Sequence, residues 1–177
     1  MLFFKYNDRK GIHVRFRIMA LAFTASVIIS TVFLVYAGDL YFKTCCLTYG
    51  VRISIQDSDI EQSASSMVVK NVFLLENPSS LSFKVTYVRE EVYDGADFET
   101  RLGETYISTP PNSYIVFVNG FSNATVDLTV SLSKNPSKQD LLIKVYMRFV
   151  DIPILDSLYL TRYFNLPLNV SSEEGVP

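Results

Sequence analysis

Histidine and cysteine, the side chains most often used as catalytic bases, nucleophiles and metal ligands, are scarce in this chain. It has one histidine, His13, and two neighbouring cysteines, Cys45 and Cys46. Because His13 precedes the long apolar segment, Ser/His/Asp and Cys/His catalysis are excluded from the later part of the chain. Two cysteines without a histidine cannot complete a zinc site, and no glycine run forms a phosphate-binding loop. We therefore predict a protein that is not an enzyme and holds neither metal nor cofactor.

Acidic residues offer one weak alternative to this prediction. Asp94, Asp97 and Glu99 could share a calcium ion, but the residue order of an EF-hand is absent. Asp94 followed by glycine is also a common hairpin dipeptide, which explains it without metal. The pair Glu90-Glu91 is interpreted as a solvated strand edge, where charge discourages aggregation.

Three kinds of covalent modification are considered. Cys45 and Cys46 are too close in sequence to bridge one another easily, so either could cross-link two copies of the chain or carry a lipid. The alternative is that both are small apolar residues near a membrane. Asn123 and Asn169 each begin an N-glycosylation sequon, which would suit an extracellular domain.

The segment Ile18–Gly38 carries no charge and is long enough, at about 1.5 Å per residue, to cross the roughly 30 Å hydrocarbon layer. We predict a transmembrane helix over 18–38. Residues 1–17 are rich in lysine and arginine, so the N-terminus is predicted to stay in the cytoplasm and the rest to lie outside. A signal peptide cleaved after Ala37 is a competing interpretation, but the apolar core is longer than usual for one.

Three further features belong to this region. A likeness to archaeal pilin-type processing at Lys10-Gly11 is weak, because arginines interrupt the apolar segment that should follow. Small residues recur at four-residue spacing within the span and could pack against another helix: Ala22, Ser26 and Ser30. Residues 39–50, with several aromatic side chains, are predicted to form a juxtamembrane linker.

The remainder of the chain reads as a series of short strands separated by turn residues. The net charge of -2, without a basic stripe, argues against nucleic-acid binding. We expect Gln56–Asp59 to be a polar turn and the wholly apolar run Tyr114–Val118 to be a central strand. An all-β, immunoglobulin-like antiparallel β-sandwich of seven to eight strands is predicted for residues 51–170, followed by a tail at 171–177. Strands are expected near residues 51–55, 68–75, 81–93, 98–108, 114–118, 126–132, 141–149 and 159–168.

The stretch Val68–Val88 is predicted to be the inner scaffold of this sandwich. Its first half holds a continuous apolar run, Val72–Leu75, as in a strand covered on both faces, and its second half alternates. Between them lies Asn77-Pro78, where proline disfavours continued strand or helix. The chain is expected to turn there from one strand to the next.

The run VKNVFLLENPSSLSFKVTYV, followed by VYDGADFETRLGE, resembles the group 2 late-embryogenesis-abundant proteins, also called the water stress and hypersensitive response domain. In that family a strand ends in Asn-Pro, an alternating strand follows, and a later segment reaches a glycine-marked bend. Here these features match Asn77-Pro78, Phe83–Tyr87 and Leu102-Gly103. The resemblance covers roughly residues 51–168 and implies a compact β-sandwich, held outside a membrane by one span in the anchored members.

These observations favour a membrane-anchored, non-enzymatic protein whose external sandwich interacts at the cell surface with another protein, a glycan or a lipid. One alternative is a structural subunit of a membrane-rooted homo-oligomer or filament, with the small-residue helix face and the cysteines joining neighbours. A second alternative is a lipid-binding domain that opens between its sheets.

Overall fold

The structure is a computed structural model that describes residues 6–62, 66–95 and 98–168, with side chains from residue 15 onward. The predicted glycosylation site Asn169 and the predicted tail 171–177 lie outside the described residues. The chain divides into two compact units, Met1–Phe42 and Lys43–Pro177.

The first unit consists of most of one long helix, α1, which runs from Tyr6 to Gly50. Its part Arg15–Gly50 is long and apolar enough to cross a membrane. The helix therefore includes the predicted span 18–38 and also continues through 39–50, the predicted linker. Neither proline nor glycine interrupts residues 39–49, so nothing in that segment stops the helix before Gly50. Ala22, Ser26 and Ser30 are exposed along it.

The last turns of α1 belong to the second unit and pack against the sandwich. Leu47 is fully buried beside Val51 and Ile53, and Thr44, three residues earlier on the same helix face, is buried as well. The Val51 amide donates to the Leu47 carbonyl at 3.1 Å, which closes the final turn. Burial of one helix face against the core therefore holds residues 44–50 in helical form.

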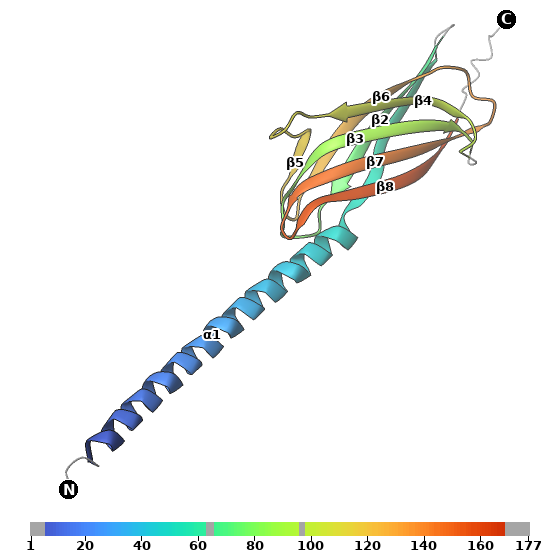
Figure 1. The fold of residues 1–177 in the computed structure, drawn as a ribbon. Coiled ribbons are helices and arrows are strands. Elements are labelled where there is room, and N and C mark those ends of the chain that lie inside the picture. The colour runs from blue at the N-terminus through green and yellow to red at the C-terminus, as the bar shows by residue number, and fades with distance from the viewer. Residues whose placement is uncertain (1–5, 63–65, 96–97, 169–177) are drawn as a thin grey trace, which may run out of the picture. The chain divides into compact units, whose positions relative to one another are not determined.

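Antiparallel strands form two sheets that enclose the core (Figure 1), as predicted. The three-stranded sheet has the order β1–β2–β6, comprising Arg52–Gln62, Met67–Glu76 and Asn123–Leu132. The larger sheet has the order β4–β3–β7–β8, comprising Arg101–Ser108, Phe83–Asp94, Asp140–Ile152 and Leu155–Pro167. The short β5, Val116–Val118, pairs with the start of β3. Consecutive strands β2 and β3 lie in different sheets, as strands B and C do in immunoglobulin-like sandwiches.

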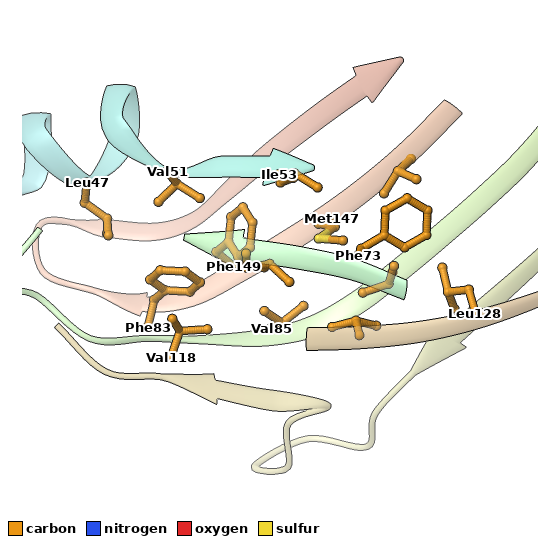
Figure 2. Packing of buried hydrophobic residues seen from close by; sticks show 14 of the residues in the cluster. Leu47, Val51, Ile53, Phe73, Phe83, Val85, Val118, Leu128, Met147 and Phe149 are labelled. Carbon is orange, nitrogen blue, oxygen red and sulfur yellow. The ribbon is translucent and has the colours of Figure 1, made fainter. Parts of the chain in front are cut away.

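The core lies between the two inner sheet faces and reaches the end of α1 (Figure 2). Phe83 of β3 and Phe149 of β7 meet edge to face, with ring centroids 4.9 Å apart. Phe73 and Leu75 approach from β2 in the opposite sheet, and all four side chains are essentially inaccessible to solvent. Side chains from both sheets and from the helix end thus form one packed interior.

The corner at Asn77-Pro78 is confirmed. It joins β2 and β3, the central strands of their respective sheets, so Val68–Val88 is the inner scaffold that the sequence predicted. The buried Asn77 side-chain amide donates to the Leu81 carbonyl at 2.7 Å and to the Asn119 carbonyl at 2.8 Å. Its oxygen accepts from the Ser79 amide at 3.0 Å. One asparagine therefore satisfies backbone groups of two neighbouring loops.

Three strand predictions were wrong in detail. Gln56–Asp59 is part of β1 rather than a turn, because a bulge between Ile55 and Asp57 shifts the register and disguises the alternation. Tyr114–Val118 is not a central strand: only Val116–Val118 pairs, at the margin, and Tyr114 is exposed. Within Val72–Leu75, only Phe73 and Leu75 are buried, so β2 is covered fully on one face.

The interpretation of Glu90-Glu91 as a solvated edge was also wrong. Strand β3 is central, with β4 on one side and β7 on the other, so neither residue lies at an edge. Glu90 points into the core with no exposed surface, and Glu91 lies on the opposite face. The predicted hairpin is present, since β3 and β4 are joined through Gly95, which has a φ of 81°.

Candidate functional site

The candidate site is the outer face of the five-stranded sheet, the side turned away from the core. Alternation along β7, a strand that the sequence predicted, buries Val145, Met147 and Phe149 and turns Tyr146 and Arg148 outward. Along β3 a register shift between Val85 and Tyr87 turns Tyr87 outward, and alternation from there turns Arg89 outward as well. Paired strands thus place tyrosines and charged residues together on one surface.

One tyrosine from each of four strands forms a row across this face. We call this set the tyrosine row: Tyr106 of β4, Tyr87 of β3, Tyr146 of β7 and Tyr159 of β8. Successive ring centroids are 6.3 Å, 5.8 Å and 5.6 Å apart. The first and last pairs are stacked, whereas the middle pair meets edge to face. Such cross-strand aromatic pairs stabilise one another by about 0.5–1.5 kcal/mol each beyond simple burial, which favours this arrangement of the rings.

An ion cluster adjoins the tyrosine row. The Glu91 carboxylate lies 2.6 Å from the Arg89 guanidinium and 3.2 Å from the Lys144 ammonium. It also accepts a hydrogen bond from the Tyr93 hydroxyl at 3.0 Å. Arg89 and Arg101 share a second acid, Glu104, at 2.6 Å and 2.7 Å.

The ion cluster determines the charge state of its central acid. Burial opposes ionisation of Glu91, but hydrogen bonds from Tyr93 and Lys144, together with the charge of Arg89, outweigh it and lower the Glu91 pKa. The bond with Glu91 likewise raises the pKa of Lys144. Around neutral pH this part of the face therefore consists of fixed, paired charges.

Arg148 differs from the other cations of this face. Its guanidinium carbon lies 5.7 Å from the centre of the Tyr159 ring, a cation–π distance. Among the described residues no carboxylate pairs with it. Arg148 lines a hollow of about 450 Å³ together with three tyrosines of the row and three charged residues of the ion cluster: Tyr87, Tyr146, Tyr159, Arg89, Glu91 and Lys144. The hollow thus combines aromatic surface with one uncompensated positive charge.

The residues that the sequence analysis selected lie elsewhere. Cys46 is exposed and Cys45 partly so on the last turns of α1, and both are free thiols. Asn123 is exposed at the start of β6. The structure brings none of these to the outer face of the larger sheet. Their proposed modifications therefore stay predictions.

Acidic groups of the described residues form no cluster of three or more that could hold a metal. Asp94, part of the calcium alternative, instead caps a loop, because its carboxylate accepts from the amides of Ser137 and Lys138 at 2.9–3.0 Å. The Ser137 hydroxyl donates to it as well and is the main reason why the Asp94 pKa is lowered. Asp97 lies outside the described residues.

Comparison with known proteins supports the fold. No protein-family model and no curated protein matches the chain. The chain is similar to a solved structural-genomics target, SoR45, with 12% identity and a TM-score of 0.52, covering 70% of this chain and 90% of the other. It is also similar to a protein from Bordetella pertussis provisionally described as ApaA, with 11% identity and a TM-score of 0.50, covering 68% and 95%. At these identities the similarity supports the sandwich alone.

A further neighbour is the solution structure of a protein provisionally described as late embryogenesis abundant. It is 16% identical, with a TM-score of 0.43, and the alignment covers 84% of this chain and 88% of the other.

Proposed function

We propose that this chain is a non-enzymatic, single-span membrane protein of the group 2 late-embryogenesis-abundant type. Its basic N-terminus lies in the cytoplasm and its sandwich lies outside, where the outer face of the larger sheet binds another surface protein. The helix long enough to cross a membrane and the basic residues before it support the anchor and its orientation.

The tyrosine row is the observation that carries the binding role. Tyrosine and arginine are the residue types most enriched at the energetic centres of protein interfaces. A tyrosine offers a large surface and loses little conformational freedom on binding, and here neighbouring rings already hold each other in place. Within the described part of the chain, the hydroxyls of Tyr87, Tyr146 and Tyr159 make no hydrogen bond. They are available to a partner.

Arg148 indicates the chemistry of that partner. A guanidinium held over an aromatic ring keeps its N–H groups free to bind a carboxylate with two hydrogen bonds. A partner that places an aspartate or glutamate in the hollow would therefore be favoured. A protein suits the hollow better than a glycan, because the stacked rings of Tyr146 and Tyr159 already cover part of each other's faces.

The proposal can be tested by site-specific photo-crosslinking on the full-length protein in its membrane. A benzophenone amino acid replaces Tyr159, at the end of the row, or Thr129, an exposed residue of β6 on the opposite sheet. We expect a defined cross-linked protein from position 159 and none from position 129. Equal cross-linking from both faces would contradict a specific interface.

The captured partner is then purified and its affinity for the chain is measured. Replacing Tyr146 with alanine removes the middle of the row, so we expect Kd to rise at least about tenfold, or about 1.4 kcal/mol. Thr129→Ala is the matched control and should leave Kd unchanged. An unchanged Kd for Tyr146→Ala would contradict the proposed role of this face in binding the partner.

A further inference from the structure

One end of the sandwich is joined to the last turns of α1. The Thr44 hydroxyl donates to the Pro153 carbonyl at 3.2 Å, between β7 and β8. Gly50 lies against Pro78, so closely that a side chain at Gly50 would meet the proline ring. We call this the helix-side end, and Figure 2 shows Leu47 and Val51 there, with Phe149 and Phe83 between them and Val118. The strands of Phe149 and Val118, β7 and β5, lead into the neighbouring loops.

Two loop tips at the helix-side end expose large apolar side chains. Phe121, between β5 and β6, is 74% exposed and shares a hollow with Gly50 and Pro78. Ile154, between β7 and β8, is 62% exposed and directly follows Pro153. Tyr49, in the last turn of α1, is 89% exposed. Packing within the fold accounts for none of these three side chains.

The backbone at the two tips has an unfavourable conformation. Phe121 has a φ of 53° and Ile154 a φ of 71°, in the left-handed region that glycine and asparagine adopt easily. For other residues this conformation costs about 1 kcal/mol or more, and a β-branched residue such as isoleucine is especially disfavoured. An exposed apolar side chain on such a backbone gains nothing within the sandwich. Neither Phe121 nor Ile154 belongs to the buried apolar clusters of the sandwich, so a contact outside the sandwich would offset this cost.

A lipid bilayer is the partner that these tips fit. This step rests on the proposed membrane anchor. Lys43, where the second unit begins, is only five residues beyond Gly38, the end of the uncharged run. A chain of that length reaches at most about 18 Å, so the helix-side end is tethered near the membrane surface. Aromatic and apolar side chains are the types that partition into the interfacial layer.

We propose that the helix-side end of the sandwich docks on the bilayer into which α1 is anchored, with Phe121 and Ile154 entering the interfacial layer of the lipid. The sandwich is then held by two attachments, the helix and these tips. The hollow of the outer face, lined along β3, β7 and β8, remains clear of the docked loops.

The absence of tryptophan from the chain provides a direct test. Full-length protein is reconstituted in phosphatidylcholine vesicles with a single tryptophan at Phe121→Trp or Ile154→Trp. Vesicles with and without phosphatidylcholine bearing a doxyl quencher near the headgroup are compared. We expect each tip tryptophan to lose about half of its emission with the quencher and to emit at shorter wavelength, as for side chains in the interfacial layer.

Two matched variants make the result specific. Phe98→Trp replaces another exposed phenylalanine with positive φ, but in the β3–β4 loop at the opposite end of the sandwich, and it should not be quenched. Tyr36→Trp reports on the anchor helix itself and should be quenched. Quenching at position 36 but not at 121 and 154 would overturn the docking and leave the anchor intact. Failure at all three positions would overturn both.

Other outcomes also count against docking. Equal quenching at position 98 would show that the sandwich contacts lipid without a preferred end. A blue-shifted but unquenched tryptophan at position 121 would indicate burial by protein. Docking opposes the glycosylation predicted at Asn123, two residues from Phe121, because a glycan carried by every copy would hold that tip out of the bilayer. Detection of such a glycan by mass spectrometry would therefore contradict the proposal.

Discussion

Glu90 is an acidic residue whose side chain points into the core of the sandwich. It lies on the buried face of β3 between Val88 and Val92, which belong to two separate apolar clusters. The Asn71 side-chain amide donates to it from β2, while its second oxygen has no partner among the described residues. Burial raises the pKa of Glu90 to about 7, against the opposing effect of the Asn71 bond. A polar pair thus divides the core.

This pKa predicts an unusual pH dependence. Since the folded protein holds the Glu90 proton more tightly than the unfolded chain, the contribution of Glu90 is greatest below about pH 4.5. It decreases as the pH rises to about 7, by about 3 kcal/mol, and then stays constant. Chemical denaturation of the full-length protein in detergent, at several values between about pH 5 and pH 8, measures the effect.

The variant Glu90→Gln isolates this contribution, because it keeps an acceptor for Asn71 and cannot ionise. We expect the difference in unfolding free energy between Glu90→Gln and the native chain to change with pH across that window. Glu91 and Asp94, whose pKa values are lowered, titrate in both proteins and cancel. A pH-independent difference would show that Glu90 titrates normally.

Asn77 is the second residue on which the fold depends. Replacing it with alanine leaves the Leu81 and Asn119 carbonyls and the Ser79 amide without their partner. We expect a loss of about 2–4 kcal/mol in unfolding free energy, measured by chemical denaturation. Pro78→Ala, at the exposed neighbouring position, should cost much less. Equal losses would mean that the asparagine bonds do not hold the corner.

At the scale of elements, the sequence predicted strands well where alternation is regular and poorly where it is not. The strand expected near residues 141–149 was confirmed as part of β7, where Val145, Met147 and Phe149 alternate with outward side chains without interruption. In β1, the bulge after Ile55 breaks the period. The run Tyr114–Val118 is apolar throughout, but hydrophobicity alone does not reveal which strand lies in the centre of a sheet.

The close approach of β4 to β6 depends on a glycine, Gly103. A side chain at Gly103 would come within 2.6 Å of the Ser131 carbonyl and 2.8 Å of Val130, so β4 can lie this close to β6 only with glycine there. Gly103→Ala is predicted to cost about 1–3 kcal/mol in unfolding free energy, because the added methyl must push the strands apart. Gly38→Ala, which meets nothing within 4 Å, is the control. An unchanged unfolding free energy for Gly103→Ala would show that β4 and β6 can move apart without cost.

At the scale of the whole molecule, the candidate site could not be predicted from the sequence. The four tyrosines of the row lie far apart along the chain. Alternation counted from Phe83 and Val85 would even place Tyr87 on the apolar face, because the sequence does not reveal the register shift that follows Val85. Only the strand order and the register align the row, for example by pairing Arg89 with both Tyr106 and Tyr146. Local sequence patterns predict the individual strands, whereas a row of side chains across several strands depends on the strand order and the register.

The proposed orientation predicts a specific pattern of cysteine reactivity. With the sandwich outside, a membrane-impermeant maleimide should label Cys46 on intact cells that express the full chain, because that thiol is exposed. Cys46→Ser should lose most of the label. A cysteine placed at Asn7, in a chain whose own cysteines are replaced, should react only after the membrane is opened. Labelling of position 7 on intact cells would reverse the proposed topology.

Non-reducing electrophoresis of the same samples tests the alternative of a cross-linked oligomer. A dimer that disappears with Cys45→Ser or Cys46→Ser would favour a structural subunit. Monomer alone, before and after the substitutions, would leave only non-covalent association to consider.

The tyrosine row also gives the protein an optical signature. Because the chain has no tryptophan, its near-ultraviolet absorption and emission arise mainly from tyrosine. Rings held as close as Tyr146 and Tyr159 couple their electronic transitions, so an ordered row should produce circular dichroism that separated tyrosines lack. A partner that wedges between these rings, or shields them from solvent, would change that signal without any added label. Binding at the proposed surface can therefore be followed by the circular dichroism of its own tyrosines.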